Sequence, residues 1–366
     1  MKVTIVTCFE SNEERVAFIK EACEGRGDEV RVITSDFSHV RKTVRNNVPE
    51  GYIAVKTKPY FRNISLGRLA SHRRFAKDAF DLIRKEDTDL LWIMAPANSL
   101  IKEAARYQRK YPHALIIVDI IDMWPESLPV RYDMHAFPFN LWRNVRKKHL
   151  YCADHLVSEC DLYQQILKEE YSGRITTIHW AKEEKAPRQP DRLPGNGMSL
   201  AYLGSINNII DTDAISGIIS RIDEHVILHV IGDGESREAF VNELSKICEV
   251  IYYGEIRDEE RKGEILSKCH AGINIYKEGL YIGLTVKCID YFMHGLPIIN
   301  NIKGDTYKMV QQNHLGINVT EDTVISAKEL KQLRNENEHI YAFYQNNFSK
   351  EIFQKKCLEV IDEVMK

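Results

Sequence analysis

Residues 281–300, YIGLTVKCIDYFMHGLPIIN, hold the densest set of side chains and turns that could bind a charged ligand. The pattern predicts a Gly-containing loop over 281–285, a helix over 286–294 that ends at Gly295, and a buried strand from 297. A helix N-terminus offers unpaired N–H groups and the positive end of a dipole, which together suit a phosphate. This stretch therefore predicts an anion-binding loop and helix.

A few side chains define the chemistry of this loop and helix. Gly283 lets a ligand approach the backbone closely, and Thr285 occupies the N-cap position. Lys287 is a cation in the first turn, where a helix disfavours positive charge unless an anion is bound. Asp290, one turn after Val286, could accept hydrogen bonds from ribose hydroxyls. The alternative is an ordinary loop, helix and strand, with Lys287 solvated and Asp290 at the surface.

A longer spacing runs through this helix, T-x-K-x-x-D-Y-x-x-x-G-x-P, formed by Thr285, Lys287, Asp290, Tyr291, Gly295 and Pro297. It resembles the nucleotide-sugar signature of retaining glycosyltransferases with the GT-B fold, and it is most similar to family 4, in the bacterial capsule and exopolysaccharide branch. In that family the helix N-terminus holds the donor diphosphate, and the carboxylate at the position of Asp290 holds the ribose. The family motif also has an acid eight positions earlier, where this chain has Ile282, and Glu278 is the nearest acid.

Composition narrows the class of protein. The 366 residues suffice for two domains, and a net charge of −3 gives no global attraction to nucleic acid. The first residues, MKVTIVTCFE, are typical of a strand and not of a signal peptide, and no apolar run approaches the roughly 20 residues of a membrane span. The eight cysteines are scattered without a C-x-x-C pair, which favours reduced thiols over disulfides or a zinc site. We expect a soluble, cytoplasmic protein without a nucleic-acid partner.

Short apolar runs alternate with amphipathic stretches along the whole chain. In the first half they predict strands at 2–7, 29–34, 51–56, 89–94 and 114–120, and helices at 12–24, 67–86 and 99–110. In the second half they predict strands at 199–204, 226–232, 249–254, 271–276 and 297–300, and helical stretches at 326–346 and 350–366. This alternation is typical of a parallel sheet that is covered on both faces.

The segment AKEEKAPRQPDRLPGNG (181–197) is rich in proline, glycine and charge, and separates the two alternations. We therefore expect an acceptor-side Rossmann-like domain over 1–180, a linker over 181–198 and a nucleotide-sugar domain over 199–345. By the resemblance, a C-terminal helix over 346–366 crosses back to the first domain. The predicted fold class is α/β, with two doubly wound Rossmann-like domains facing across a cleft, as in the GT-B fold.

Ligands of open α/β sheets bind beyond the carboxyl ends of the strands, and three such ends in the second half carry glycine. The candidate nucleotide-sugar residues are Gly204, Ser205, Gly232, Gly254, Glu255, Ile256, Gly283, Leu284, Thr285, Val286, Lys287 and Asp290. By the resemblance, the backbone at Glu255 and Ile256 meets the base, and Gly204 and Ser205 approach the diphosphate. Many relatives have an Arg and a Lys after the first glycine, whereas SINNIIDTD (205–213) has neither, so the charge of Lys287 gains importance.

The donor site is expected to work without a bound metal. No Asp-x-Asp pair lies at the mouth of the second-domain sheet, since Asp211 and Asp213 are typical of a helix start. The expected donor is UDP-linked rather than GDP-linked, with no further cofactor.

In the first half, ALIIVDIIDMWPES (114–127) runs from a buried strand into an acidic and aromatic loop. For Asp119 we expect a loop-bracing role, because a buried carboxylate needs partners. The spacing D-x-W-P-E-S resembles the cleft loop of the same bacterial branch, in which Asp122 falls close to a histidine position near the reacting sugar. Asp122 is therefore the first catalytic candidate and Glu126 the second, in a reaction dominated by positioning and leaving-group stabilisation.

Two stretches of the first half, 56–77 and 135–151, mix cations with aromatic residues. This chemistry suits an anionic membrane surface, although it also fits a solvated helix face whose aromatics are core. The candidate membrane or acceptor residues are Phe137, Phe139, Trp142, Arg146, Lys147 and Lys148. The expected location is peripheral, at the inner face of the cell membrane.

The resemblance implies transfer of a sugar, with retention, from a nucleotide sugar to a lipid-linked or oligosaccharide acceptor in surface polysaccharide synthesis. Two other classes stay open. The same fold hosts nucleotide-sugar epimerases, and a non-catalytic partner could keep the fold without the chemistry. The departures at Ile282 and over 205–213 keep the non-catalytic class open.

Overall fold

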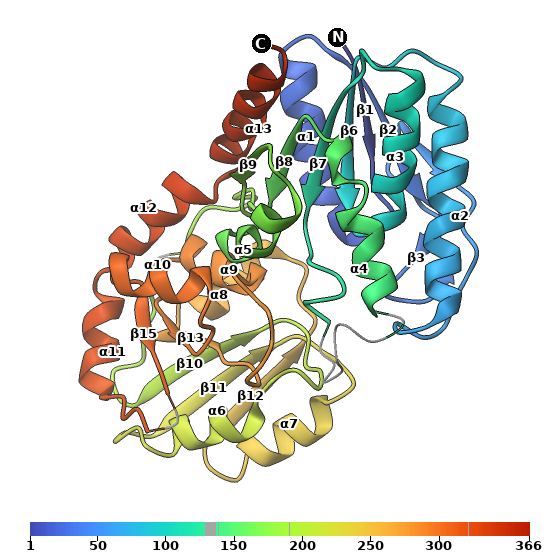
Figure 1. Ribbon diagram of the computed structural model, residues 1–366. Coiled ribbons are helices and arrows are strands. Elements are labelled where there is room, and N and C mark those ends of the chain that lie inside the picture. The colour runs from blue at the N-terminus through green and yellow to red at the C-terminus, as the bar shows by residue number, and fades with distance from the viewer. Residues whose placement is uncertain (129–136, 138, 190, 321) are drawn as a thin grey trace. The chain divides into compact units, whose positions relative to one another are not determined.

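The computed structural model describes residues 1–128, 137, 139–189, 191–320 and 322–366. The chain forms two compact units (Figure 1). Unit 1 contains Met1–His179 and Phe353–Lys366, and unit 2 contains Trp180–Ile352. Each unit is built around its own parallel sheet.

In unit 1 the sheet has the strand order β5-β2-β1-β6-β7-β8-β9, and every pairing is parallel. Its strands are β1 (Lys2–Val6), β2 (Glu29–Ser35), β5 (Tyr52–Val55), β6 (Leu90–Ala95), β7 (Leu115–Ile120), β8 (His155–Ser158) and β9 (Arg174–Thr177). Its helices are α1 (Glu13–Gly25), α2 (Leu66–Ile83), α3 (Asn98–Lys110), α4 (Phe139–Lys147), α5 (Asp161–Glu170) and most of α13 (Lys350–Val364). A small antiparallel pair, β3 (Phe37–Ser38) and β4 (Thr43–Val44), and two short 3₁₀ turns, Glu10–Asn12 and Leu150–Cys152, lie in its loops.

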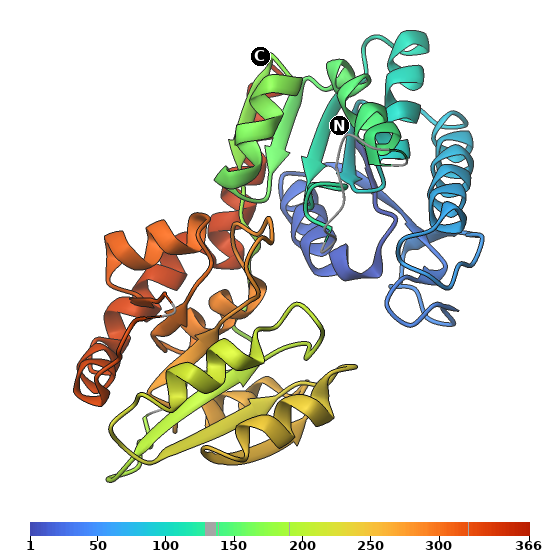
Figure 2. The ribbon, with the colours of Figure 1, turned by 60° about the horizontal axis from the view of Figure 1, so that its bottom comes forward.

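Helices cover both faces of this sheet. Helices α2, α3 and α4 lie together on one face, and α1 and α13 lie side by side on the other (Figures 1 and 2). Phe18 of α1 packs edge to face on Phe353 of α13, with ring centroids 5.9 Å apart. All six residues of β6 are buried, as expected for a central strand covered on both sides.

In unit 2 the sheet has the order β12-β11-β10-β13-β14-β15, again parallel throughout. Its strands are β10 (Met198–Leu203), β11 (Val226–Ile231), β12 (Glu249–Gly254), β13 (Ala271–Asn274), β14 (Ile298–Asn300) and β15 (Gly316–Asn318). Its helices are α6 (Thr212–Ile219), α7 (Arg237–Leu244), α8 (Glu259–Leu266), α9 (Val286–Met293), α10 (Asp305–Asn313), α11 (Ala327–Arg334) and α12 (Asn337–Asn347). One hydrophobic cluster joins the sheet to α6, α7 and α11, and a second joins it to α8, α9, α10 and α12.

The expected α/β class and the two Rossmann-like domains are confirmed, and the predicted strands are present with ends that shift by two residues at most. The single helix expected over 326–346 is instead two helices, because a turn between Arg334 and Asn337 interrupts it. The apolar runs did not predict β8, α5 or β9, and the two strands are only four residues long.

A buried ion pair joins separated parts of unit 1. The guanidinium of Arg15 on α1 donates to both carboxylate oxygens of Asp119 on β7, over 2.9 and 3.0 Å. It also donates to the carbonyls of Ile178 and His179, at the end of the first part of unit 1, and lies 4.8 Å from the ring centroid of Phe353. Asp119 thus has the bracing role expected for it, and Arg15 connects α1, the sheet and α13.

We expect Arg15→Met to lower the free energy of unfolding by about 3–5 kcal/mol, because it leaves the Asp119 carboxylate buried without its cation. Urea unfolding followed by circular dichroism measures the change. Arg74→Met is the control, since Arg74 is exposed and its pair with Asp78 lies on one helix face, so it should lower the free energy of unfolding far less than Arg15→Met does. If both substitutions lowered the free energy of unfolding equally, the buried ion pair would contribute no more to stability than the exposed one.

Candidate functional site

A pocket of 330 Å³ opens beyond the carboxyl ends of β10, β11 and β12, beside the first turns of α9. Eight of the twelve candidate nucleotide-sugar residues line it, namely Gly204, Ser205, Gly232, Glu255, Ile256, Val286, Lys287 and Asp290. The structure therefore brings together residues that are separated by more than eighty positions in the chain. This is the edge at which parallel α/β sheets bind their ligands.

Close backbone packing shapes the floor of this pocket. Gly232 has a φ of 146°, and a Cβ there would lie 2.0 Å from the carbonyl oxygen of Gly204. Only glycine allows the loops after β10 and β11 to approach so closely. Gly204 has a φ of 105°, and a Cβ on it would lie 3.8 Å from Cε of Lys287, so the lysine stem passes beside the backbone of this turn.

Lys287 is the distinctive group of the pocket. Its side chain is buried, with 8% of the residue exposed, and its Nζ has no hydrogen-bond partner among the described residues. Nζ lies 4.3 Å from the ring centroid of Tyr202 and 4.7 Å from that of Tyr276. Burial lowers the pKa of Lys287 to about 7. The solvated lysine of the alternative interpretation is therefore wrong, and the pocket holds a desolvated amine with which no described residue forms an ion pair.

Asp290 lies one helical turn along α9, on the wall of the same pocket. Its Oδ1 is 3.6 Å from Nζ of Lys262, which itself pairs with Glu259 at 2.8 Å. The residue is half-buried, so its carboxylate faces the pocket without being sealed in the core.

Four candidate residues do not line the pocket. Gly254 has a left-handed φ of 72°, and its carbonyl accepts from the N–H of Gly232 at 2.8 Å. The carbonyl of Gly283 accepts from Thr306, and Leu284 packs in the core.

Thr285, the fourth of these residues, occupies the N-cap position of α9, but its hydroxyl does not cap the helix. Its Oγ1 instead donates to Oδ1 of Asn274 at 2.9 Å. No side-chain cap thus occupies the first turn of the helix, although the N-cap position itself was predicted correctly.

Two cations of the pocket were missed by sequence reasoning. Arg257 and Lys262 line it from the connection between β12 and the first half of α8. Their positions in the sequence could have indicated them, because they follow Glu255, which was expected to meet the base, by two and seven residues. The positive charge that the 205–213 segment lacks is therefore present, but it comes from another strand end.

Glu278, the acid nearest to the family motif position, and Asp211, the first acid of the Asp-x-Asp pair, do not line the pocket that holds Lys287. Glu278 is exposed, and its Oε1 lies 3.6 Å from Nζ of Lys303. Asp211 accepts from the N–H of Ala214 as the N-cap of α6, as the sequence predicted. Among the described residues no group of three or more His, Cys, Asp or Glu side chains is arranged to hold a metal ion.

The two catalytic candidates of unit 1 have distinct surroundings. Glu126 accepts from both terminal nitrogens of Arg146, at 2.8 and 2.9 Å, so its carboxylate is engaged in a two-point ion pair. Asp122 accepts from the hydroxyl of Ser127, and burial raises the pKa of Asp122. Of these two acids, only Glu126 forms an ion pair in the described part of the chain.

Only half of the six candidate membrane residues have side chains exposed at the surface. Phe139 and Trp142 are buried, and so is Arg146, which also pairs with Glu170 at 2.8 Å. These three side chains cannot contact a lipid surface, because they form the core between α4 and the rest of unit 1. Phe137, which is 76% exposed, and the exposed Lys147 and Lys148 fit the expectation. In the described ranges no helix is both long and apolar enough to cross a membrane.

Comparison with known proteins identifies the fold. No protein-family model matches the sequence, and no curated protein matches it. Among solved structures, sucrose-phosphate synthase from Thermosynechococcus elongatus matches with a TM-score of 0.74 at 12% identity, over 100% of this chain and 99% of that one. The lipopolysaccharide outer core galactosyltransferase WaaB in its apo form matches at 0.69 and 14%, over 99% of each chain. Anabaena HepE in complex with UDP-glucose matches at 0.67 and 12%, over 99% of this chain and all of that one. The chain therefore has the GT-B fold that the sequence predicted.

We expect Lys287→Met to stabilise the protein at pH 7, on the order of 1 kcal/mol or more, because it removes a desolvated amine. The pKa of Lys287 lies near 7 in the folded chain and near its ordinary value of 10.5 when unfolded, so between these values the unfolded chain binds more protons. The stabilisation should be full below pH 7 and should fade as the pH rises toward about 10. Thermal unfolding of both proteins across this range measures it. A variant that is less stable than wild type at pH 7 would contradict the assignment of a strained, unpaired lysine.

Proposed function

We propose that this protein is a glycosyltransferase that uses a UDP-linked sugar, bound in the pocket of unit 2. The single observation that carries the proposal is the buried amine of Lys287, which has no counter-ion among the residues that the structure describes and lies at the uncapped N-terminus of α9. A diphosphate would supply that counter-ion and would also accept from the first-turn N–H groups. The structure of Anabaena HepE, which shares the fold, contains UDP-glucose, and this supports a uridine nucleotide.

The remaining residues of the pocket fit a nucleotide in the proposed arrangement. Asp290 can accept from ribose hydroxyls, and the backbone at Glu255 and Ile256 can meet the base, with Arg257 beside it. Gly204 and Ser205 leave room for the phosphates next to Lys287. Stabilisation of the leaving diphosphate by fixed positive groups lowers the barrier without a metal ion, so we infer metal-independent transfer.

The finer parts of the proposal rest on the sequence resemblance to the capsule and exopolysaccharide branch of family 4. They are retention at the anomeric carbon, a lipid-linked or oligosaccharide acceptor, and a role in surface polysaccharide synthesis. Asp122 is proposed to act near the acceptor, because its carboxyl is not held in an ion pair as that of Glu126 is.

A second candidate function has one observation in its favour. A putative UDP-N-acetylglucosamine 2-epimerase from Listeria monocytogenes matches the structure with a TM-score of 0.60 at 11% identity, over 98% of this chain and 95% of that one. Incubation with UDP-sugars in EDTA, followed by product analysis, separates the classes. Released UDP indicates transfer or hydrolysis, an altered sugar on intact UDP indicates an epimerase, and binding without turnover indicates a non-catalytic partner.

We expect Lys287→Met and Asp290→Asn each to weaken UDP binding by about tenfold or more, because each removes a charge-assisted contact worth roughly 1.5–3 kcal/mol. Titration calorimetry measures the affinities. Lys303→Met is the matched control, since Lys303 is an exposed lysine of the same unit and does not line the pocket. Unchanged affinity in both pocket variants would overturn the donor site.

We further expect wild type to take up a proton when it binds UDP at pH 8. The free amine of Lys287, with a pKa of about 7, is mostly neutral there, and a bound diphosphate raises its pKa. Affinity should therefore fall as the pH rises above 7. Calorimetry in two buffers of different ionisation enthalpy measures the uptake, and Lys287→Met should show none. Equal uptake in the two proteins would assign the proton to another group.

We also propose that unit 1 approaches an anionic membrane surface, because a lipid-linked acceptor presents its sugar close to the bilayer. Support comes from exposed apolar residues and exposed lysines on α4 and its flanks, namely Phe137, Leu141, Lys147 and Lys148. An apolar anchor and several cations together are what peripheral binding requires.

We expect wild type to sediment with anionic liposomes at low salt, and the double variant Lys147→Glu, Lys148→Glu to stay in solution, because each cation contributes about 1 kcal/mol. The control reverses two exposed lysines of unit 2, Lys308 and Lys328, and should sediment like wild type. Wild type that stays in the supernatant, or a double variant that sediments equally, would remove this surface from the proposal.

A further inference from the structure

Unit 1 contains a second set of polar groups that the donor site does not use. They gather where β1, β2 and β7 end and where α2 begins, the edge of a parallel sheet at which ligands bind. The set is an aromatic cage that encloses cations and histidines, formed by Phe9, His39, Lys42, Tyr60, Arg68, His72 and Trp124.

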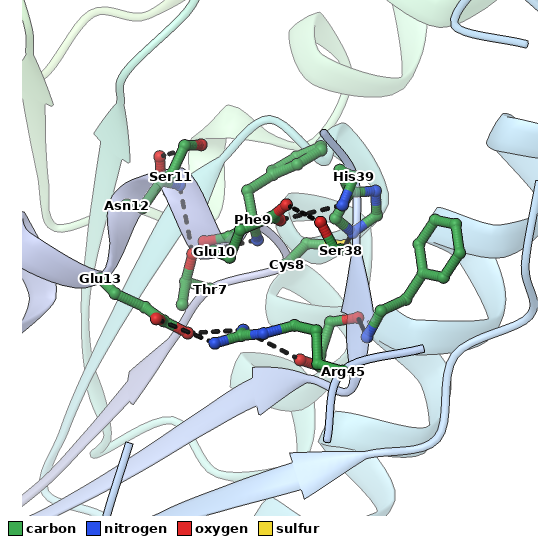
Figure 3. Close-up of polar contacts among 12 residues, drawn as sticks. Thr7, Cys8, Phe9, Glu10, Ser11, Asn12, Glu13, Ser38, His39 and Arg45 are labelled. Carbon is green, nitrogen blue, oxygen red and sulfur yellow. Dashed lines mark hydrogen bonds and ion pairs between the residues drawn. The ribbon is translucent and has the colours of Figure 1, made fainter. Parts of the chain in front are cut away.

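One wall of the cage is the loop around His39, which hydrogen bonds to the carboxylate of Glu10 hold in place (Figure 3). The carboxylate of Glu10 accepts from the hydroxyl of Ser38 at 2.7 Å and from the N–H groups of His39 and Val40 at 3.0 Å each. These hydrogen bonds lower the pKa of Glu10 despite its burial, which acts in the other direction. Lys42 closes the loop with a left-handed φ of 59°, unusual for a residue with a side chain. Its Nζ thereby lies 4.5 Å from the ring centroid of Tyr60.

Arg68 is the second cation of the cage. Only 6% of it is exposed, and its guanidinium carbon lies 3.8 Å from the ring centroid of Trp124 and 5.7 Å from that of Tyr60. It donates to the carbonyl of Asn63 at 2.9 Å, while its Nε has no partner among the described residues. Burial lowers the pKa of Lys42, and the like charge of Arg68 lowers it further, so the two cations are near enough to repel each other.

Among the described residues no acid forms an ion pair with Arg68 or Lys42. Asp122 lies near enough to Arg68, and Glu10 near enough to Lys42, to oppose part of the lowering of their pKa values by burial. The salt bridges of that part of the chain include neither Arg68 nor Lys42, although the structure forms many ion pairs elsewhere. Glu10 is occupied by the loop it holds, and Asp122 accepts from Ser127. Two neighbouring cations, one of them buried, are costly to keep without an anion.

His72 is a further polar group of the cage whose hydrogen bonds are not made by the described residues. It is 2% exposed, stacks on Trp124 at 6.1 Å with an interplanar angle of 16°, and neither ring nitrogen has a partner in the described part of the chain. Burial is the main cause that lowers the pKa of His72, so the ring is neutral and carries one N–H that could donate. Buried polar groups are almost always hydrogen-bonded, so such a ring calls for a partner that the described part of the chain does not supply.

We propose that Arg68 and Lys42 form the receptor for an acidic group of the acceptor, either a phosphate or a carboxylate. A planar guanidinium whose Nε has no partner among the described residues suits both groups, because guanidinium N–H groups form strong, charge-assisted hydrogen bonds to carboxylate and phosphate oxygens. Trp124 and Tyr60 would flank the ligand on the side of the cations. The acceptor part of this proposal rests on the proposed glycosyltransferase function, whereas the anion receptor itself is a property of unit 1.

The test measures anion binding by calorimetry at low salt in the Lys287→Met protein, which lacks the cation of the donor pocket. The probes are inorganic pyrophosphate and glucuronate, so that a phosphate receptor and a carboxylate receptor give different results. We expect at least one probe to bind, and Arg68→Gln or Lys42→Gln in the same background to weaken it by about tenfold or more. Arg73→Gln, which changes an exposed arginine of the same helix, should leave the affinity within about twofold of its parent.

Lys42→Gln keeps the test decisive if Arg68→Gln does not fold, since Lys42 is half-exposed on a loop. The proposal is overturned if neither probe binds, if binding survives both substitutions, or if Arg73→Gln weakens it equally. Failure of the donor site would appear separately, as wild type that binds no UDP while the anion still binds unit 1. Where transfer is observed, Arg68→Gln should raise the KM for an acidic acceptor and leave that for the UDP-sugar unchanged.

Discussion

The guanidinium of Arg15 is the point at which the separated parts of unit 1 meet. It neutralises Asp119 in the middle of the sheet, holds the carbonyls of Ile178 and His179, and lies against Phe353. Asp119 lies next to the carboxyl end of β7, so the loop that carries Asp122 and Trp124 projects from a strand that this ion pair joins to α1. A buried charge pair of this kind fixes position more than it adds stability, because desolvation offsets much of its attraction.

The two candidate sites share a physical principle. In each, aromatic rings surround a cation that lacks a counter-ion in the described residues: Tyr202 and Tyr276 around Lys287, and Tyr60 and Trp124 around Arg68. Aromatic faces offset part of the desolvation of a cation but do not occupy its hydrogen bonds. A fold can therefore keep such a group in place for a ligand, at some expense in its own stability.

Much of the fold and of the donor pocket could be predicted from the sequence. Short apolar runs located the strands, and the loop and helix around Lys287 have a local signature that does not depend on the rest of the chain. What the sequence could not show was burial. Phe139, Trp142 and Arg146 have the composition of a membrane-facing helix, yet tertiary packing turns them inward, where Arg146 meets Glu126 and Glu170.

The second candidate site could not be predicted from the sequence either, because it also depends on tertiary packing. Its members come from several loops and from α2, and no spacing within one segment relates His39 to His72 or Trp124. The two cations of the donor pocket that were missed, Arg257 and Lys262, likewise depend on how the loop after β12 turns. Residues that act together through tertiary contacts leave only compositional traces in a single sequence.

The return of the chain to unit 1 has a consequence for how the protein is made. The ribosome releases residues in chain order, and domains generally fold as units while synthesis proceeds. Unit 2, over Trp180–Ile352, is therefore translated in full before Phe353 reaches Arg15, and until then the face of α1 that receives α13 stays uncovered. The nascent first unit must wait through the synthesis of the second with exposed apolar surface, which is the kind of interval in which a chaperone has something to bind.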